Sequence, residues 1–474
     1  MKKVFISGCF NVVHPGHLRI LRFGKEVGQF LTVGVSSDRI SQGGSFVKEE
    51  LRLENVRSIA WVDESFIYDE PIDELILRIK PDIVIKGSEF ESLYNSELGA
   101  VNKYGGRLLF CSGEAMFSSA DLISQELNSV KNKLNLHKNF LTTHSISLNR
   151  LIDVVENFKN LKVLTIGDLI IDQYINCNAV GMSQEEPTLV VTPVDDAQFI
   201  GGAGIVAGHA ASMSSKSYFL TLAGKDTESS FALSKLEANF INAEAFIDET
   251  RPTSLKTRFR AGGKSLLRVN RLHTHDISSE LELKLLESLE RIITDVDLVI
   301  LSDFNHGCLP KKIVLKIMNI INKHHNKFIS ADSQSSSQIG DLRKFQNVDL
   351  ITATEYEARL TVGDSQIGLV VLSKRLKELC NAKNILLKLG PDGVMIADPN
   401  SEFTFTDILP AFNSSPIDVS GAGDSMLVAS SMALCCGATV WEAGYLGSLA
   451  AGIQVSRLGN IPISSAELIS ALKG

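Results

Sequence analysis

Short apolar runs alternate with helical patterns of apolar positions at the start of the chain. Residues 3–8 form an apolar run that ends at a glycine, residues 18–27 have the spacing of an amphipathic helix, and residues 31–35 form a second apolar run. The order strand, loop, helix, strand is how a parallel nucleotide-binding sheet begins. We therefore expect residues 1–127 to form an α/β domain with a Rossmann-like parallel sheet.

The alternation is lost after residue 127. Residues 128–145 are mostly polar and favour a linker, with the domain boundary near residue 140. Ser147 then precedes a new amphipathic run, where its hydroxyl can cap the first turn of a helix. We expect a second domain over residues 146–474.

The second domain repeats the alternation of strand and helix over a greater length. Apolar, strand-like runs and two helical patterns occur at residues 162–167, 298–301, 328–331, 349–352, 385–389 and 394–397 (strands) and at residues 205–212 and 311–323 (helices). This pattern predicts a doubly wound α/β sheet, which binds its ligands at the carboxyl ends of the strands.

Two further segments do not fit that sheet and predict a small β lid. Residues 189–194 are apolar and β-branched. Residues 254–260 and 266–270 lie on either side of Gly262-Gly263 and alternate as the two strands of a hairpin do. Their lysine and arginine side chains should lie on one face of that hairpin.

Composition and charge narrow the classes of function. Of the 474 residues, 44% are hydrophobic and 22% are charged, which is ordinary for a soluble globular protein. The formal net charge of −8 and the lack of a basic run give no reason to expect nucleic acid as a partner. No stretch approaches the ~20 apolar residues that a membrane span needs, so we expect no membrane partner.

The cysteines and the amino terminus bear on the compartment. The 7 cysteines are scattered except for Cys435-Cys436, and they form neither a disulfide framework nor a C-x-x-C metal pattern. Met1-Lys2-Lys3 before an apolar run superficially resembles a signal peptide, but Asn11 and His14 interrupt the run too early. These observations predict a cytoplasmic protein.

A glycine turn leads into a helical run near the carboxyl end. Residues 417–424 read IDVSGAGD. The amides of Gly421, Ala422 and Gly423 and the positive end of the helix suit a transferring phosphoryl group. Asp424 lies at the mouth of this anion site and can take the proton from an attacking hydroxyl. The last four residues taken alone fit a tight turn capped by aspartate equally well.

A second candidate site follows the first predicted strand. Residues 7–17 read SGCFNVVHPGH and place His14 and His17 on either side of Gly16 at the start of a helix. Two imidazoles there can donate to phosphate oxygens, and the glycine lets a phosphate approach the backbone. A lone histidine is more often structural, but this paired spacing on a strand-to-helix turn favours a functional site.

Residues 7–17 resemble the signature of the cytidylyltransferase-like nucleotidyltransferases. Later segments are also similar to that family, namely Glu50-Leu51-Arg52, Trp61-Val62-Asp63-Glu64, Lys86-Gly87-Ser88-Glu89 and Phe117-Ser118-Ser119-Ala120. Asn11 and Glu89 stand where many members have aspartate, which puts substrate detail in doubt rather than the chemistry.

The resemblance implies a nucleotidyl transfer. His14 and His17 would stabilise the pentacoordinate phosphorus while a sugar or alcohol phosphate attacks the α-phosphate of a nucleoside triphosphate. The implied nucleotide-binding residues are Gly8, Phe10, Gly16, Lys86, Ser118 and Ser119. Taken alone, Lys86 could equally be a solvated lysine at the end of a strand.

The second domain resembles the ribokinase-like (phosphofructokinase-B) sugar kinases over nearly its whole length. The similar segments are Gly201-Gly202-Ala203, Thr354-Glu355-Tyr356-Glu357, Lys388-x-Gly390-x-x-Gly393 and Asp418 to Asp424. The resemblance makes Asp424 the general base and Glu357 the residue that organises Mg²⁺ through water. It also implies the nucleotide-binding residues Lys388, Gly390, Gly393, Gly421, Ala422 and Gly423.

A narrower resemblance is to the bifunctional heptose kinase/adenylyltransferases, which make ADP-heptose for lipopolysaccharide. It rests on Gly167-Asp168, Asp172, Ser183, Glu185, Pro187, Lys256-x-Arg258, Leu266-Leu267-Arg268 and Leu301-Ser302-Asp303. The order of the two halves here is the reverse of the order in that family. The implied substrate-binding residues are Asp168, Asp172, Gly201, Gly202, Lys256, Arg258, Arg268 and Asp303. The three cations among them suit a substrate phosphate, although an ordinary exposed hairpin would also carry such charges.

Several positions depart from the kinase pattern. Ile205 stands where these kinases place an asparagine near the sugar hydroxyls, and Thr354 replaces another asparagine. Asp332-Ser333-Gln334 replaces Asp-Pro-Lys, and Asn270 replaces an aspartate. The residues for transfer match the family, while those that would read the sugar do not all match.

We therefore expect a bifunctional enzyme that uses ATP and Mg²⁺ to phosphorylate a sugar phosphate and then couples a sugar 1-phosphate to a nucleotide. ATP is the first choice for the second step, and CTP the alternative. Two other hypotheses stay open, a single active nucleotidyltransferase with the kinase domain as a sensor or dimerisation module, and a CTP-using cytidylyltransferase fused to a sugar kinase. Lid strands in this kinase family often pair between subunits, so a homodimer through the lid is also expected.

Overall fold

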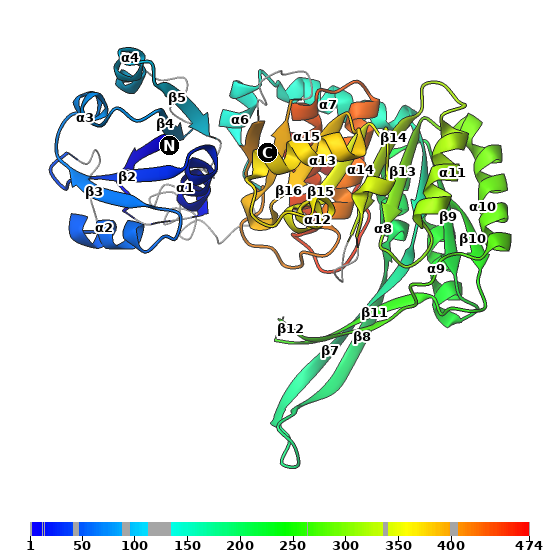
Figure 1. Ribbon diagram of the computed structural model, residues 1–474. Helices are drawn as coiled ribbons and strands as arrows, with labels where there is room; N and C mark the ends of the chain where they lie inside the picture. Colours follow the sequence, from blue (N-terminus) through cyan, green and yellow to red (C-terminus); the bar gives the residue numbers. More distant parts are fainter. Residues whose placement is uncertain are drawn as a thin grey trace. The chain divides into compact units, whose positions relative to one another are not determined.

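The computed structural model describes residues 2–11, 13, 15–40, 47–87, 95–111, 134–262, 264–334, 340–398 and 406–473. The chain divides into two compact units, coloured from blue to red along the sequence in Figure 1. The first comprises residues 1–131 with the short segments 366–372 and 406–410, and the second comprises the remainder.

A five-stranded parallel sheet forms the first unit, in the order β3-β2-β1-β4-β5. Its strands are β1 (Lys3–Gly8), β2 (Phe30–Ser36), β3 (Glu64–Tyr68), β4 (Ile83–Gly87) and β5 (Arg107–Cys111). Its helices are α1 (Pro15–Val27), α2 (Glu49–Arg57), α3 (Ile72–Ile79) and α4 (Ser96–Asn102). The predicted Rossmann-like sheet is confirmed.

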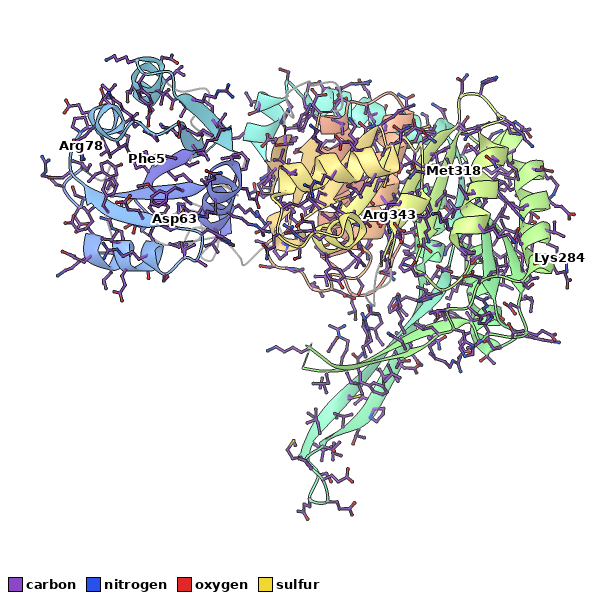
Figure 2. The ribbon with its side chains drawn as sticks, in the orientation of Figure 1. Phe5, Asp63, Arg78, Lys284, Met318 and Arg343 are labelled. Atoms are coloured by element: carbon purple, nitrogen blue, oxygen red, sulfur yellow. The ribbon has the colours of Figure 1, made fainter. Side chains whose placement is uncertain are left out.

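Both faces of this sheet are covered. Val4 and Ile6 of β1 belong to an apolar cluster with Leu21 of α1. Phe5, labelled in Figure 2, points to the other face and packs with Leu75 of α3. Successive residues of a strand point to opposite faces, so a strand covered on both sides has to be apolar throughout.

The strand order defines where a ligand can bind in this unit. β1 is paired on one side with β2 and on the other with β4, so the chain direction around the sheet changes at β1. Ligands of open parallel sheets bind at the carboxyl ends of the strands beside such a switch point. Gly8 ends β1, and α1 begins at Pro15, so Gly16 and His17 lie at that place.

A nine-stranded sheet follows the order β10-β9-β6-β13-β14-β15-β16-β17-β18, and all of its strands except β18, which is part of the segment 406–410, belong to the second unit. Its strands are β6 (Lys162–Gly167), β9 (Lys216–Ala223), β10 (Ile241–Ile247), β13 (Leu298–Asp303), β14 (Phe328–Ser333), β15 (Leu350–Thr354), β16 (Asn384–Lys388), β17 (Val394–Ala397) and β18 (Thr406–Leu409). The pairs from β10 to β16 are parallel, and β17 runs antiparallel to β16. This confirms the predicted α/β sheet.

The helices after residue 137 are α6 (Lys138–Thr143), α7 (Leu148–Asn157), α8 (Ala203–Met213), α9 (Thr227–Ala238), α10 (Ser279–Ile292), α11 (Lys311–Ile321), α12 (Glu355–Val362), α13 (Leu369–Cys380), α14 (Ala422–Cys435), α15 (Val440–Gln454) and α16 (Ser465–Lys473). α14 and α15 are buried along most of their length, as the apolar sequence after Asp424 predicts. Within the described residues, none of these helices has the length and apolarity to cross a membrane.

A four-stranded sheet in the order β12-β11-β7-β8 forms the lid of the second unit. It consists of β7 (Leu169–Met182), β8 (Leu189–Gly202), β11 (Ser254–Ala261) and β12 (Lys264–Arg271). Figure 1 shows β7 and β8 as a long ribbon that extends away from the nine-stranded sheet. β11 and β12 pair antiparallel, so the predicted hairpin is confirmed.

The second unit starts earlier in the sequence than residue 146. Phe140 of α6 is buried, and its ring lies 6.2 Å from the ring of Trp441 and 6.3 Å from that of Tyr445 on α15. The ring of His144 stacks on Trp441 at 3.9 Å. Aromatic residues in an otherwise polar stretch therefore join residues 137–145 to the kinase-like unit, where a linker was expected.

Candidate active site

Gly421 forms the turn before α14 in the geometry that the sequence predicts. Its φ of 77° is left-handed, and a Cβ there would lie 2.6 Å from Oδ1 of Asn460, so no other residue fits without strain. The side-chain amide of Gln454 donates to the carbonyl of Gly459 at 2.9 Å and to that of Ser420 at 3.4 Å. The turn is thereby held from the far end of α15.

Asp418 fixes the other end of the same turn. Its carboxylate accepts hydrogen bonds from the Tyr174 hydroxyl at 2.7 Å and from the amides of Ser420 at 3.0 Å and Gly459 at 3.1 Å. Burial alone would raise the pKa of Asp418, but these hydrogen bonds hold it below its ordinary value. Asp418 therefore stays ionised and orients the turn.

Asp424 lies in the first turn of α14 and is buried. The side-chain amide of Gln334 donates to its Oδ1 at 3.0 Å. Burial, together with the nearby carboxylate of Asp332, raises the pKa of Asp424 to about 7, although Lys388 opposes this shift. A carboxylate with such a pKa at the start of a helix has the properties of a general base.

Lys388 supplies a buried cation beneath the glycine turn. Its Nζ lies 2.7 Å from Oδ2 of Asp332, which also accepts a hydrogen bond from the Thr352 hydroxyl at 3.0 Å. Burial alone would lower the pKa of Lys388, but Asp332 and Glu357 raise it. A Cβ on Gly423 would lie 3.2 Å from Nζ, so the ammonium and the turn are in direct contact.

Gly390 and Gly393 enclose a short 3-10 turn, Gly390–Asp392, directly after β16. Their φ values are 64° and 95°, both left-handed, and the carbonyl of Gly393 accepts from the amide of Leu389 at 2.8 Å. Only Leu389 separates this turn from Lys388 at the end of β16, so the two glycines lie at the carboxyl edge of the sheet.

Glu357 and Thr354 form a capping box at the start of α12. The Thr354 amide donates to Oε2 of Glu357 at 2.7 Å, and the Glu357 amide donates to the Thr354 hydroxyl at 3.2 Å. Threonine thus performs the capping that an asparagine could perform at the same position.

Asp172 lies on β7 beside Lys256 of β11 in the strand register. Its carboxylate accepts from Arg258 at 2.6 Å and from the side-chain amide of Asn460 at 2.9 Å. A Cβ on Gly201 would lie 2.2 Å from Oδ2 of Asp172, so glycine at position 201 leaves room for that carboxylate.

Cations lie on one face of β11, as the alternation predicts. The guanidinium groups of Arg258 and Arg260 lie 5.1 Å and 5.5 Å from the centre of the Tyr174 ring. Lys256 is buried, and burial lowers the pKa of its ammonium. Arg268 pairs with Arg258 across the hairpin but lies on the exposed strand β12.

Asp168 serves the backbone at the base of the lid. Its carboxylate is buried and accepts from the amides of Phe304 at 2.8 Å and Cys308 at 3.0 Å. Gly202 has a φ of 58°, and a Cβ there would lie 2.5 Å from the carbonyl of Asp168. Both residues therefore shape the junction of lid and sheet, and their contact with substrate stays a prediction.

Asp303 is likewise engaged within the chain. Its Oδ2 lies 2.5 Å from the ammonium of Lys344 and accepts from the Ser333 hydroxyl at 2.6 Å. Burial raises the pKa of Asp303. Its role in substrate binding is untested, but its contacts join the ends of β13 and β14.

The predicted site of the first unit is described only in part. His17 lies in the first turn of α1, and its ring is 5.0 Å from the ring of Phe10, which is buried with a left-handed φ of 52°. Lys86 forms an ion pair of 2.6 Å with Glu97. Gly8 ends β1, and Gly16 is the second residue of α1. His14, Ser118, Ser119 and Glu89 lie outside the described residues.

Arg52, in the E-x-R segment, is fully buried beneath this site. It donates to the carbonyls of Val47 at 2.8 Å, Cys9 at 2.6 Å and Ser36 at 2.9 Å, and it pairs with Asp38. One guanidinium therefore joins the carboxyl ends of the neighbouring strands β1 and β2.

Three residues near the kinase-like site were assigned no role from the sequence, namely Tyr174, Gln334 and Asn460. At position 334 the sequence showed only that glutamine departs from the family pattern, and this departure did not indicate a role. Tyr174 and Asn460 gave no signal, because their partners are 244 and 288 residues away in the chain.

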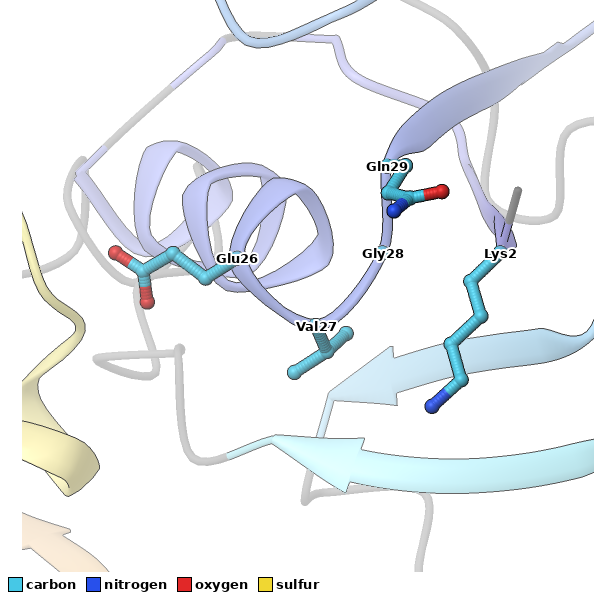
Figure 3. A pocket seen from close by; sticks show the side chains of 5 residues that line it. All are labelled: Lys2, Glu26, Val27, Gly28 and Gln29. Atoms are coloured by element: carbon cyan, nitrogen blue, oxygen red, sulfur yellow. The ribbon is translucent and has the colours of Figure 1, made fainter.

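A cavity of about 420 Å³ in the first unit lies away from the candidate residues. Figure 3 shows it at the carboxyl end of α1, where Val27, Gly28 and Gln29 lead into β2 and Lys2 precedes β1. That is the amino edge of the sheet, opposite the edge at which Gly8 and His17 lie. The cavity is therefore separate from the predicted nucleotide site.

Comparison with known families identifies the larger part of the chain. Residues 160–466 match the pfkB family carbohydrate kinases. The chain belongs to the pfkB family. Residues 5–105 match the cytidylyltransferase-like family, so the nucleotidyltransferase-like region precedes the pfkB kinase region. Both resemblances inferred from the motifs are confirmed.

Relatives that are named as bifunctional proteins resemble this pfkB chain. It is 28% identical over 66% of its length to "Bifunctional protein HldE" of Helicobacter hepaticus, and 29% identical over 67% of its length to the protein of that name from Desulfatibacillum aliphaticivorans. The alignments span 64% of each relative, so the chain matches just under two thirds of their length.

Solved structures agree with the pfkB fold. Ribokinase from Thermotoga maritima matches 66% of the chain and all of its own length, with a TM-score of 0.53 and 22% identity. Phosphofructokinase-2 from Escherichia coli in complex with potassium matches 66% of the chain and 98% of its own, with a TM-score of 0.53 and 14% identity. At these identities the agreement concerns the fold alone.

Proposed function

We propose that the chain is a bifunctional enzyme that phosphorylates a sugar phosphate and also transfers a nucleotidyl group to a sugar 1-phosphate. The kinase activity is supported by one observation. Asp424 is buried beside the glycine turn that starts α14, and the Lys388 ammonium lies beneath that turn. A turn of amides for a phosphoryl group and a base for the acceptor are the two elements that such a transfer needs.

The kinase step follows from these positions. Asp424 takes the proton from the acceptor hydroxyl as its oxygen forms a bond to the γ-phosphorus of ATP. The bond between that phosphorus and the β–γ bridging oxygen breaks, and ADP leaves. The amides of residues 421–423 and the ammonium of Lys388 stabilise the charge on the transferring group. The γ-phosphoryl group is then bound to the sugar oxygen, and the proton of the sugar hydroxyl is bound to Asp424.

Mg²⁺ is the metal that we expect with ATP. Among the described residues, no three histidine, cysteine, aspartate or glutamate side chains are grouped so that they could hold a metal ion. Mg²⁺ would therefore be held by phosphate oxygens of ATP and by water, and the carboxylate of Glu357 would order that water. When bound, the ion neutralises charge on the phosphates.

The cation face of the lid supports a phosphorylated acceptor. Lys256 and Arg258 flank Asp172, which offers a carboxylate to sugar hydroxyls, and Arg268 is opposite Arg258. A guanidinium group can donate two parallel hydrogen bonds to the oxygens of one phosphate. A heptose phosphate as acceptor and ADP-heptose as final product, for surface polysaccharide, are supported by the similarity to proteins named HldE.

The nucleotidyl transfer is supported by the first unit. His17 lies in the first turn of α1, and Arg52 joins the carboxyl ends of β1 and β2. In the reaction, an oxygen of the sugar 1-phosphate attacks the α-phosphorus of the nucleoside triphosphate, and pyrophosphate leaves. ATP is the proposed nucleotide.

Incubation of the full chain with ATP, Mg²⁺ and a panel of heptose and hexose phosphates, followed by mass spectrometry, tests both steps. We expect a gain of one phosphoryl group, and pyrophosphate release with sugar 1-phosphates. Asp424→Asn should abolish only the first product and His17→Asn only the second. No sugar-dependent ATP use by the wild type would leave the nucleotidyltransferase as the single activity.

A second nucleotide remains a candidate because the match over residues 5–105 is to a family named for cytidylyl transfer. Pyrophosphate release measured with ATP and CTP at equal concentration, with the same sugar 1-phosphate, separates the two. Faster release with CTP would replace the adenylyltransferase proposal.

A homodimer through the lid is part of the proposal. The β7–β8 ribbon exposes apolar side chains, namely Val180, Met182, Leu189, Val190 and Val194. Apolar residues on a protruding ribbon fit a second copy of the same ribbon. Light scattering of the full chain should give twice the mass of one chain. The cytoplasmic location remains a prediction from the cysteine pattern.

A further inference from the structure

We propose that Gln334 is a positioning residue for Asp424. Its neutral amide holds one carboxylate oxygen, so that the other oxygen faces the acceptor hydroxyl. This inference deepens the proposed kinase function and rests on it for its catalytic consequence. The contact between Gln334 and Asp424 is independent of the kinase function and can be tested without substrate.

The position of Gln334 is defined by the end of a neighbouring strand. Its amide donates to the carbonyl of Asp303 at 2.8 Å, and its carbonyl accepts from the side-chain amide of Asn305 at 3.0 Å. The backbone is thus held at both ends of the residue. The side chain then donates from Nε2 to Oδ1 of Asp424 at 3.0 Å.

Within the described part of the chain, Gln334 provides the one hydrogen bond to the Asp424 carboxylate. The nearest cation, Lys388, is already paired with Asp332 at 2.7 Å. A carboxylate held by one oxygen keeps a fixed plane, and its second oxygen stays free to accept a proton. This is the arrangement that a general base needs.

The charged groups around Asp424 explain why a neutral donor is suited to this position. Asp332 of β14 and Asp172 of β7 raise its pKa, whereas Lys388 of β16 and Lys256 of β11 lower it. Burial is the largest influence, and the result is a pKa of about 7. An amide stabilises the ionised form through a hydrogen bond without adding a positive charge that would weaken the base.

The first test uses unfolding and needs no substrate. The full chain is compared as wild type, Gln334→Leu, Asp424→Asn and the double variant, in thermal unfolding at pH 5.5 and pH 8.5. Because the amide binds the ionised carboxylate more strongly than the protonated one, Gln334→Leu should lower the Tm more at the higher pH, by at least ~2 °C. In the Asp424→Asn background this pH dependence should vanish.

The second test uses catalysis. With ATP, Mg²⁺ and a heptose 7-phosphate as probe, the wild-type kcat should rise with pH through the pKa of Asp424. Gln334→Leu should move this rise to higher pH by about one unit and lower kcat roughly tenfold, with the KM for ATP unchanged. Gln334→Glu, nearly equal in size, should move it further, because it adds a like charge.

Gln346→Leu is the matched control, since that partly buried glutamine bonds only backbone carbonyls away from the site. It should change neither pH profile. Gln334→Leu could instead lower the Tm equally at both pH values, or with the same pH dependence in the wild-type and Asp424→Asn proteins. Either result would show that Gln334 contributes packing alone and does not position Asp424. If the wild type does not phosphorylate the probe, the proposed kinase function fails on that substrate, and the unfolding cycle still decides the role of Gln334.

Discussion

Replacing Asp424 with asparagine should abolish phosphoryl transfer and, at the same time, make the protein more stable. The carboxylate is buried among other charges, and its pKa is raised from 3.8 to about 7. The folded chain therefore holds a proton on Asp424 that the unfolded chain releases above pH ~4. Asparagine has nearly the same shape and cannot ionise, so it removes this pH-dependent term.

The magnitude follows from the shift. Because the carboxyl pKa is raised, Asp424 does not lower the stability of the fold below pH 3.8. As the pH rises from 3.8 to about 7, the free energy of unfolding falls. A shift of about three units corresponds to roughly 4 kcal/mol at pH 8, at about 1.4 kcal/mol for each unit. In a unit of this size, that difference should move the Tm by roughly 5–8 °C.

The assay is thermal unfolding of the full chain between pH 4 and pH 8. Wild type and Asp424→Asn should unfold at similar temperatures at pH 4, and the variant should be several degrees more stable at pH 8. Turnover of ATP with a sugar phosphate should fall by about 10²–10⁴-fold, as expected when a general base is lost. Asp153→Asn, on the exposed face of α7, is the control and should change neither quantity.

Two results would refute this reasoning. A variant that is less stable than wild type at pH 8 would mean that the Asp424 carboxylate is stabilised in the fold. An Asp424→Asn enzyme with wild-type turnover would mean that another group takes the proton from the acceptor.

Three further predictions concern other parts of the chain. Tyr174→Phe removes the hydroxyl that donates to Asp418, so it should destabilise the second unit by about 1–2 kcal/mol and raise the KM for the sugar, measured by unfolding and kinetics. Arg52→Met leaves buried backbone carbonyls without a donor, so it should destabilise the first unit by ~3 kcal/mol and reduce pyrophosphate release while sugar phosphorylation persists. Met182→Asp puts a charge at an exposed apolar position of the lid, so light scattering should give the mass of one chain, and an unchanged dimer would place the interface elsewhere.

Much of the fold could be predicted because the signals are local. The apolar run of β1 and the alternation in β11 and β12 lie within a few residues of one another, and the structure confirms both elements. The glycine at position 421 was expected at a turn, and its φ of 77° shows the conformational reason.

The boundary between the two units was only partly predictable, and residues 137–145 show the cause. Polar composition favoured a linker there, but three aromatic contacts to α15 make the segment part of the second unit. Composition reports the average character of a segment, whereas a few buried side chains decide where it packs.

The sequence by itself determined the two α/β units, the lid hairpin, the glycine turn and the identity of the acid at its mouth, since each depends on residues close together in the chain. Only the tertiary structure decided that Gln334 holds Asp424, that Tyr174 holds Asp418 and that Asn460 holds Asp172. These contacts join elements through the order of strands in the sheet and the path of the lid. A hydrogen bond between residues 90 to 288 positions apart leaves no periodic trace in one sequence, because either partner would look ordinary alone.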